Sequence, residues 1–342
     1  MTTVVPGTPS AVELEAARLL LERLGVTPED LLAVPQQRPP VPTFAEYIPE
    51  VVEAVSKGTR RVYGSYWNRI RANWGDRHLD EPTASEVKQL AEHVQATAKV
   101  RRNGRGGRGA AEHFIAALRC LYKHAENDQL ITEAHNPARK VDKPRRLPST
   151  RCAIPSNGLA EINHVVATTG NDPELDTLIL RLHTETACRR GGALALRPKD
   201  LDPKQCLILL REKGGTARWQ PVSPTLMRGL LRHAKERGAG ADDQLLRYRD
   251  GRPITTRRYD HLWSRIGKHL QWVAAQQLST HWLRHTTLTW VERNFGYGIA
   301  RAFAGHNDQS GDPGTTTTYI RANLQEIAKA LAALTGEPHP LA

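Results

Sequence analysis

Apolar residues return every three or four positions over long stretches of the chain, the spacing of one buried face of an α-helix. Such stretches lie between residues 43 and 136, and together they predict a small helical bundle. Their apolar positions are Phe44, Tyr47, Ile48 and Val51; Tyr63, Tyr66, Trp67 and Ile70; and Phe114, Ile115, Leu118, Leu121 and Tyr122.

Residues 207–219 have a different pattern. A short apolar run at 207–210 is followed by Gly214-Gly215, which marks a turn, and by Trp219. We therefore expect a strand, a glycine turn with Lys213 at its tip, and a returning strand. With helical patterns elsewhere, the expected fold class is mainly α with a small β-hairpin or sheet in the second half of the chain (α+β).

The two ends of the chain carry further helical patterns. A short amphipathic helix is expected from Ala11 to Leu24, and four prolines follow within residues 35–42. Near the C-terminus a second amphipathic helix is expected to end near Gly336. Its apolar positions are Leu324, Ile327, Ala328, Leu331 and Leu334.

Another expected helix, which begins near residue 280, brings basic side chains together. Thr280 is placed to cap it, and His281 and Arg284 lie one turn apart on a face that they share. A phosphate held there would meet both an imidazole and a guanidinium. The apolar stripe of this helix consists of Leu283, Thr287, Trp290 and Val291.

Two more residues that could take part in catalysis follow this helix. A short helix is expected to end at Gly305, so His306 follows at a helix exit, where its side chain can point into a cleft. Tyr319 then stands in the run Thr-Thr-Thr-Thr-Tyr-Ile. By itself such a tyrosine is most often an ordinary surface residue.

The charge balance favours a polyanionic partner. The chain has 48 Lys and Arg against 36 Asp and Glu, a net charge of +12 and a pI of about 9.8. Such a balance suits DNA and also an anionic membrane surface, so only the positions of the basic residues can distinguish between these two partners. Two basic runs at 99–108 and 139–151 supply candidates for DNA-backbone contacts: Arg101, Arg102, Arg105, Arg108, Lys143, Arg145 and Arg146.

The second basic run also divides the chain. Its two prolines predict an extended linker, which either follows a DNA backbone or serves as a solvated hinge. We expect a chain of 342 residues to form two domains. The expected segments are an N-terminal extension with a short helix and a proline-rich linker (1–40), a helical domain (41–137), the basic linker (138–151) and a second domain (152–342).

Other classes of protein are disfavoured. No stretch approaches the roughly 20 apolar residues of a membrane-spanning helix, and no signal peptide opens the chain. His281 and His285 could form a zinc pair, but no Glu or Cys nearby completes a ligand set, so we expect no metal and no cofactor. Four cysteines without paired spacing fit reduced thiols in a cytoplasm, and we expect Cys188 to be a buried packing residue; the cysteines are Cys120, Cys152, Cys188 and Cys206.

Six residues, taken in chain order, resemble the catalytic set of the tyrosine recombinases, the phage-integrase family. The most specific part is His281-x-x-Arg284-His285-Thr286 together with Gly305-His306 and the later tyrosine. The resemblance spans roughly residues 150–335 and extends more weakly to about residue 40. The six residues are Arg189, Lys213, His281, Arg284, His306 and Tyr319.

The resemblance implies a role for each of these residues. Two guanidiniums, those of Arg189 and Arg284, would clamp the phosphodiester, because Arg offers a planar fork of donors that stays protonated. Tyr319 would attack phosphorus and form a covalent phosphotyrosine, which needs neither ATP nor metal. Lys213 would protonate the leaving 5′-oxygen. The histidines His281 and His306 would assist proton transfer and bind the phosphate.

Two features depart from the family pattern. The family usually has an acidic residue three positions after the first Arg, whereas this chain has Gly192. Thirteen positions separate His306 from Tyr319, where many relatives have about nine, and the extra residues look like a turn-rich loop. Arg190 could compete with Arg189 for the first position, but Arg189 keeps Leu194 and Leu196 in register and is placed correctly relative to Lys213.

The resemblance further implies a site-specific DNA recombinase that works as a homotetramer on two duplexes through a Holliday junction. The helical domain would correspond to the core-binding domain and residues 152–342 to the catalytic domain. The C-terminal helix would dock on a neighbouring protomer or pack on its own domain. An integrase of a phage or mobile element is favoured over a chromosome-dimer resolvase, with accessory or directionality proteins as further partners, no membrane, and a prokaryotic cytoplasm with nucleoid association as the location.

Two alternatives stay open at this point. A type IB topoisomerase uses a similar residue set to relax DNA as a monomer. A non-catalytic DNA-binding protein on a recombinase fold is the other, and Gly192 is the feature that favours it.

Overall fold

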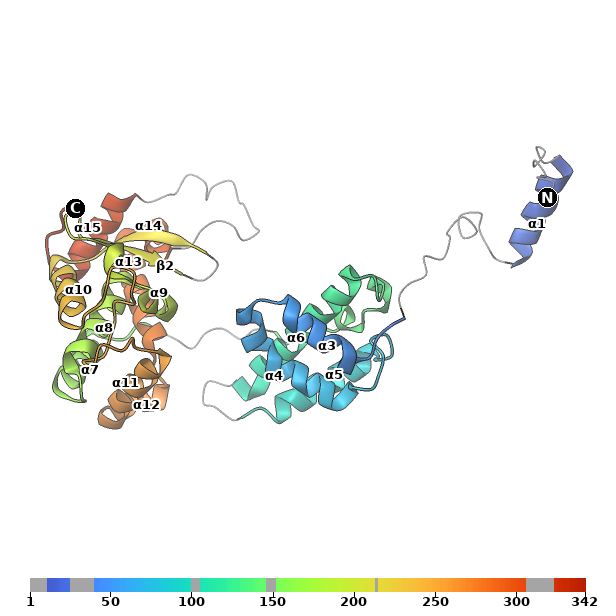
Figure 1. The fold of residues 1–342 in the computed structure, drawn as a ribbon, viewed down its shortest axis with the longest axis horizontal. Coiled ribbons are helices and arrows are strands. Elements are labelled where there is room, and N and C mark those ends of the chain that lie inside the picture. Colours follow the sequence, from blue (N-terminus) through green and yellow to red (C-terminus); the bar gives the residue numbers. More distant parts are fainter. Residues whose placement is uncertain (1–10, 25–39, 100–104, 146–151, 213–214, 306–322) are drawn as a thin grey trace. The chain divides into compact units, whose positions relative to one another are not determined.

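The computed structural model describes residues 11–24, 40–99, 105–145, 152–212, 215–305 and 323–342. Their contacts divide the chain into two compact units, Met1–Arg146 and Leu147–Ala342 (Figure 1). Helices predominate, and the strands of the described residues form one small antiparallel sheet. The expected fold class is therefore confirmed. The expected N-terminal helix is also present, as α1 (Ala11–Leu24).

The first unit is a helical bundle. Capping boxes start two of its helices. The hydroxyls of Thr43 and Thr83 each accept a hydrogen bond from the backbone N–H of the glutamate three residues later, and the carboxylate of that glutamate accepts one in return from the threonine's backbone N–H. Trp67 is fully buried and donates through Nε1 to the carbonyl of Ala117 over 3.0 Å. The helices are α3 (Phe44–Ala54), α4 (Lys57–Trp74), α5 (Ala84–Ala96) and α6 (Arg108–Asn127), with 3₁₀ turns η1 (Arg105–Gly107) and η2 (Glu133–His135).

The expected basic linker begins too early in the sequence. Residues Pro137–Lys140 form the 3₁₀ turn η3, and Ala138 and Val141 are buried in the core of the first unit. Arg139, although exposed, pairs with Glu126 of the bundle over 2.9 Å. The two prolines that suggested an extended chain, Pro144 and Pro148, come after this turn, and Pro137 is an acceptable first residue of a helical turn.

The second unit is built around the buried helix α8 (Pro173–Thr186), which packs against α7, α10 and α13. Asp172 caps α8 by accepting from the N–H of Leu175, and Pro173 occupies the first position of the helix, where its missing N–H costs nothing. The other helices are α7 (Ser156–Thr168), α9 (Arg190–Leu194), η4 (Pro198–Asp200), α10 (Pro224–Glu236), α11 (Thr256–His269), α12 (Gln271–Gln276), α13 (Thr280–Phe295), α14 (Tyr297–Phe303) and α15 (Leu324–Thr335).

The expected strand pair is present. Strands β2 (Leu207–Arg211) and β3 (Ala217–Pro221) are antiparallel with Leu209 opposite Trp219, and β1 (Leu201–Asp202) adds a third strand in the order β1-β2-β3. Ile208 and Leu210 are fully buried and fasten β2 to the core of the unit. The sheet therefore holds the hairpin end of β2 close to α9, which it contacts.

Helix α13 differs from expectation in two ways. Its N-cap is Ser279 and not Thr280, whose hydroxyl instead accepts a hydrogen bond from Trp263 Nε1 over 2.8 Å. It is also buried on most sides, because Arg284 and Thr287 point inward and bond to backbone carbonyls. A stripe of apolar residues on one face was thus too simple a description of a helix that crosses the core.

The C-terminal helix packs on its own unit. Ile327 and Leu331 of α15 join Val291 of α13 and Phe303 of α14 in one apolar cluster. Beyond Gly336, whose φ of 69° ends the helix, the carboxylate of Glu337 accepts from the N–H of Thr225 over 3.1 Å.

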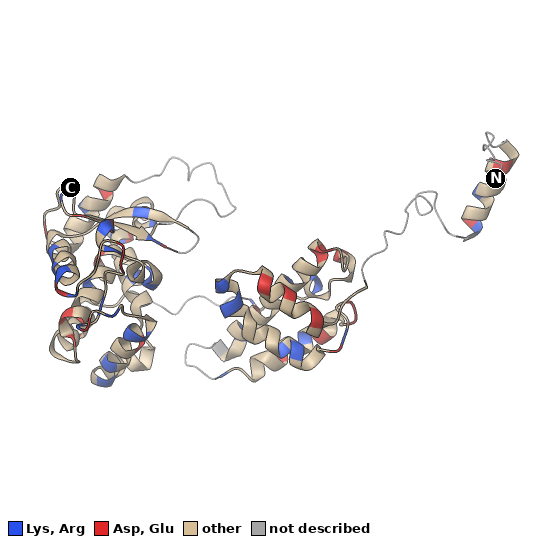
Figure 2. Ribbon diagram, in the orientation of Figure 1, with Lys and Arg blue, Asp and Glu red and all other residues tan. Residues whose placement is uncertain are grey.

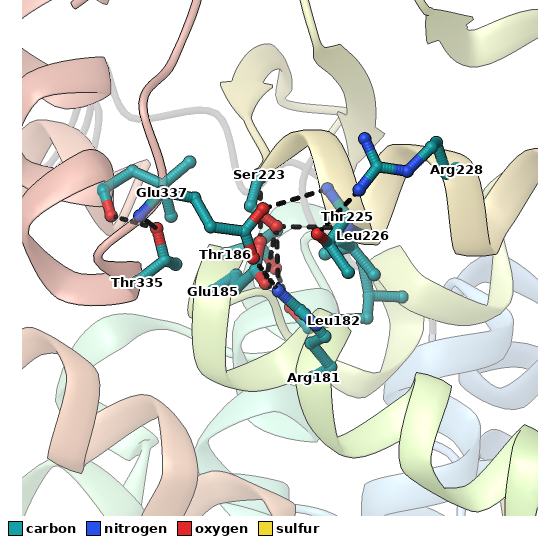
Figure 3. A network of polar contacts seen from close by, with 11 residues as sticks. Arg181, Leu182, Glu185, Thr186, Ser223, Thr225, Leu226, Arg228, Thr335 and Glu337 are labelled. Atoms are coloured by element: carbon teal, nitrogen blue, oxygen red, sulfur yellow. Dashed lines mark hydrogen bonds and ion pairs between the residues drawn. The ribbon is translucent and has the colours of Figure 1, made fainter.

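Figure 3 shows the polar network that fixes this end of the chain. Arg181 of α8 pairs with both Glu185 and Glu337, and Glu185 accepts from the hydroxyl of Ser223 over 2.9 Å. Because Glu185 is almost completely buried, the network attaches the C-terminal segment to the centre of the second unit. Of the two packing arrangements considered for the C-terminal helix, the structure contains the one on its own unit.

Candidate catalytic site

Arg189 lies at the start of α9, in extended conformation with φ −77° and ψ 153°. Its backbone N–H donates to Glu212 Oε1 over 2.7 Å, and its Nη1 donates to Glu212 Oε2 over 2.6 Å. The carboxylate is 2 % exposed and the guanidinium 40 % exposed. Glu212 thus fixes Arg189 at two points and leaves the rest of its fork accessible.

Arg284 approaches from α13 and is 4 % exposed. It donates through Nη1 to the carbonyl of Ala187 and through Nη2 to that of Ala304, the latter over 2.7 Å. Ala187 has φ 49° and ends α8, while Ala304 ends α14. The guanidinium therefore joins the ends of two helices, and burial together with the charge of Arg189 lowers its pKa to about 10, so it stays protonated at neutral pH.

A third guanidinium, that of Arg218 on β3, lies close to the same place. Its buried Nε and Nη2 atoms have no hydrogen-bond partner in the described part of the chain, and Nη1 donates to Gln220. Burial lowers its pKa, and the charge of Arg189 lowers it further while that of Glu212 raises it. Gly305 has φ 65°, and a Cβ there would overlap Arg218 Nε, so only glycine fits beside this side chain.

Arg189 and His281 line one hollow of about 620 Å³. His281 is exposed, and its ring meets that of His285 edge to face at 4.8 Å between centroids. The wall of the hollow comes from α9, α11 and the start of α13, and consists of Cys188, Arg189, Arg190, Gly191, Tyr259, Asp260, Trp263, Leu278, Ser279, Thr280 and His281.

The electrostatics of this region favour an anion. Besides burial, the charges of Arg189 and Arg218 lower the pKa of Arg284, and the charge of Arg189 lowers that of Arg218, while one carboxylate, Glu212, acts in the opposite direction on both. Residues 147–342 contain 26 of the 48 Lys and Arg and 18 of the 36 Asp and Glu, so eight of the twelve net positive charges belong to this unit. Figure 2 shows Lys and Arg (blue) on several helices of this unit, with Asp and Glu (red) in between.

Cys188 precedes Arg189 and is buried, as expected. Burial raises the pKa of its thiol to about 11, and the neighbouring His183, 3.4 Å from the sulfur, has its pKa lowered by burial to about 4. Both groups are therefore neutral at physiological pH. His183 also contacts the hydroxyl of Tyr259 over 3.1 Å, so this group supports the wall beneath Arg189 and offers no reactive thiolate.

Three of the six sequence-predicted residues lie outside the described residues: Lys213, His306 and Tyr319. The structure brings the other three, Arg189, His281 and Arg284, into one region. Among the candidates for DNA-backbone contact, Arg108, Lys143 and Arg145 are exposed, whereas Arg101, Arg102, Arg146 and the side chain of Arg105 lie outside the described part.

Sequence reasoning missed two residues of the site, Glu212 and Arg218. The only signal for Glu212 was the missing acid at Gly192, because an ion pair between a strand end and a helix start 23 residues earlier has no local pattern. Arg218 gave no signal at all, since it stands in a strand where an alternating arginine is usually solvated.

Within the described residues, no group of three or more His, Cys, Asp or Glu could hold a metal ion. No helix among these residues is both long enough and apolar enough to cross a membrane.

Comparisons with known proteins agree with this geometry. Residues 154–326 match the model of the Phage integrase family. The chain is 25 % identical over 246 residues to the tyrosine recombinase XerC of Chromobacterium violaceum, covering 70 % of this chain and 78 % of that protein. It is also 25 % identical over 295 residues to the tyrosine recombinase XerA of Pyrococcus horikoshii, covering 84 % and 90 % respectively.

Solved structures share the fold. A lambda integrase tetramer bound to a Holliday junction has a TM-score of 0.60 at 15 % identity and covers 90 % of each chain. The Tn1549 transposon integrase in complex with circular intermediate DNA has a TM-score of 0.59 at 16 % identity, covering 82 % of this chain and 95 % of that one. Since the family model spans half of the chain and includes Arg189, His281, Arg284 and the segment with Tyr319, the chain belongs to the phage integrase family of tyrosine recombinases.

Proposed function

We propose that this protein is a site-specific DNA recombinase, an integrase that cleaves and rejoins DNA through a 3′-phosphotyrosine intermediate. The observation that carries the proposal is the convergence of Arg189, Arg218 and Arg284 on one region of a family member, beside a hollow that His281 also lines. The proposal rests on the chemistry that such a cluster can perform.

The arginines would stabilise charge on the phosphate. In the transition state of phosphoryl transfer, negative charge spreads over the non-bridging oxygens, and preorganised cations aimed at them lower the barrier. Arg284 is held by two carbonyls and Arg189 by Glu212, so neither has to reorganise when the phosphate binds. We assign the clamp to these two residues.

The covalent step follows from the sequence motif. The phenolic oxygen of Tyr319 attacks phosphorus, the bond from phosphorus to the 5′-oxygen breaks, and Lys213 donates the proton that the leaving oxygen needs. His281 assists proton transfer and His306 binds the phosphate. The phosphoester energy is kept in the protein–DNA link, so religation requires neither ATP nor metal.

Strand exchange belongs to the same proposal. Integrases of this fold have been solved as a dimer on a core site and as a tetramer on a Holliday junction. We infer that this chain likewise assembles as a homotetramer on two copies of a specific double-stranded site. Residues 41–137 would act as the core-binding domain and residues 152–342 as the catalytic domain, joined by a basic linker within residues 138–151.

Exposed basic residues of the first unit are the proposed backbone contacts. Arg108 begins α6, and Lys143 and Arg145 follow the last turn of the bundle. None of the three takes part in an ion pair among the described residues, so each can approach a phosphate without breaking an internal bond. Phosphate contacts of this kind set affinity and position but carry no sequence information.

Covalent trapping tests the proposal. Wild-type protein and Tyr319→Phe are incubated with fragmented genomic DNA of the source cell, denatured, and the attached DNA is sequenced. Adducts at one short site, absent in the variant, are expected. Scattered adducts with DNA relaxation would indicate a type IB topoisomerase, and DNA binding without any adduct would indicate a non-catalytic DNA-binding protein on this fold.

A further inference from the structure

Arg189 has a carboxylate partner, but this partner does not come from the position where the family usually has an acidic residue, because a glycine stands there. Gly192 stands three residues after Arg189, so α9 offers no acid there. In the structure the carboxylate of Glu212, from the end of β2, bonds both the backbone and the guanidinium of Arg189.

Gly192 and Glu212 share one space. A Cβ added at Gly192 would lie 3.1 Å from Glu212 Cγ and 3.4 Å from its Oε1. Side chains at both positions would therefore compete for the volume beneath Arg189, and two carboxylates there would also repel each other. The glycine is what allows the acid to reach Arg189 from the strand side.

We propose that Glu212 is the positioning residue for Arg189, and that Gly192 and Glu212 are an exchanged pair in which the acid has moved from helix α9 to strand β2. This inference rests on the proposed function and names a residue that acts through Arg189 without touching the substrate. The acid's position also couples the clamp to the hairpin, because Glu212 immediately precedes Lys213, the proposed general acid.

The geometry suits a positioning role. The carboxylate is almost completely buried, and the N–H of Glu212 itself donates to the carbonyl of Thr216 across the hairpin over 2.8 Å. The hairpin pairing therefore fixes the backbone from β2 up to the acid itself. Charge-assisted hydrogen bonds to a buried carboxylate are directional, so the fork of Arg189 is held in one orientation toward the hollow.

The test exchanges the two residues. We expect Glu212→Gly to lower the rate of covalent adduct formation about 10²-fold, the scale of a misplaced catalytic group. Gly192→Glu alone should also lower it, because the new acid collides with Glu212. The double variant Gly192→Glu/Glu212→Gly should recover to within about tenfold of wild type, since the carboxylate then reaches Arg189 from α9. The substrate is a nicked duplex that carries the site recovered by covalent trapping.

A second buried ion pair, between Asp200 and Arg211, provides a matched control; Arg211 directly precedes Glu212. Asp200 is 2 % exposed and accepts from Arg211, which is 40 % exposed, over 2.5 Å. These values match those of the Glu212–Arg189 pair, but Asp200 does not contact Arg189. Asp200→Gly should therefore destabilise the unit to a similar degree in urea without the loss in adduct formation. An equal loss in Asp200→Gly would show that Glu212 acts only through folding, and would overturn the inference.

A second readout does not depend on catalysis. In ¹⁵N spectra of protein labelled at arginine, the Arg189 guanidinium should show slow rotation in wild type and in the double variant, and fast rotation in Glu212→Gly. Rotation that is unchanged by Glu212→Gly, or a double variant as inactive as the single ones, contradicts the positioning role. If wild type forms no adduct, the proposed function fails, while the guanidinium spectra still decide whether Glu212 holds Arg189.

Discussion

Replacing Arg284 by Met separates catalysis from stability. The substitution removes the charge and its donors but keeps a long, flexible side chain in the same space. In the folded protein Arg284 donates to the carbonyls of Ala187 and Ala304, both of which belong to buried residues. Each carbonyl left unpaired costs about 1–3 kcal/mol, so the loss for the two is about 2–6 kcal/mol.

An opposing term comes from burial of the charge. Burial, together with the charge of Arg189, lowers the pKa of Arg284 well below its ordinary value, to about 10. At about 1.4 kcal/mol per pKa unit, burial of this protonated guanidinium lowers the free energy of unfolding by about 3 kcal/mol. The variant regains that amount, so its free energy of unfolding should lie between about 1 kcal/mol above and about 3 kcal/mol below the wild-type value.

Adduct formation should respond far more strongly. Removal of one preorganised donor from a transition state costs about 10²–10³-fold in rate. Urea unfolding, followed by tryptophan fluorescence, and adduct formation on a nicked duplex measure the two effects. Arg228→Met is the control, because Arg228 is exposed on α10, donates to the hydroxyl of Thr225 over 3.0 Å, and does not line the hollow. A variant at Arg284 that cleaves within tenfold of wild type, or one that loses more than about 5 kcal/mol, would refute the reasoning.

Three further predictions concern the glycine at the end of α14, a buried histidine and the basic linker. Gly305→Ala should lower the free energy of unfolding by about 1–2 kcal/mol because of its φ of 65°, and should also displace Arg218 and slow cleavage. Gly336→Ala, at φ 69° with no atom near the added Cβ, should show only the cost of the backbone conformation. Equal cleavage in both variants would remove Arg218 from the site. The pKa of His183 is about 4 in the folded protein and about 6.5 in the unfolded chain, because burial disfavours the charged imidazole. The neutral histidine therefore contributes about 3 kcal/mol to the free energy of unfolding above pH 6.5, and this contribution is lost as the pH falls toward 4. If a His183→Asn variant shows the same acid sensitivity in urea unfolding, His183 is not the group responsible. Lys143→Gln with Arg145→Gln should lower the salt dependence of DNA binding by about 0.9 per lost phosphate contact, and an unchanged slope would make this segment a hinge.

Periodicity predicted helices such as α3 and α15 well because each of them buries one face. The apolar positions at Phe44, Tyr47 and Ile48 lie on the buried side of α3, and those at Ile327 and Leu331 lie on the buried side of α15. The strand pair was equally clear, since a short apolar run and a glycine turn have few other solutions.

The errors arose where polar groups are satisfied by distant partners. Arg284 and Thr287 are polar yet buried, because carbonyls from α8 and the end of α14 receive their hydrogen bonds. The basic run was expected to be an extended linker from residue 138 onward, although Arg139 pairs with Glu126 of the bundle. No local pattern encodes these partners.

The candidate site was predictable only in part for the same reason. Arg189, His281 and Arg284 belong to motifs of fixed spacing, whereas Glu212 and Arg218 enter through the antiparallel register of β2 and β3. The departure at Gly192 was visible in the sequence. Glu212, which takes the place of the missing acid, could be identified only once the structure showed which strand end lies next to α9.

The most direct test of the central claim is the covalent trapping of DNA by wild type and Tyr319→Phe. The variant lacks only the attacking oxygen, so it should bind DNA with nearly unchanged affinity and form no denaturation-resistant adduct. Wild type should form adducts at one short sequence, in the presence of EDTA as well as without it. Adducts that persist in Tyr319→Phe would show that another residue is the nucleophile and would contradict the account.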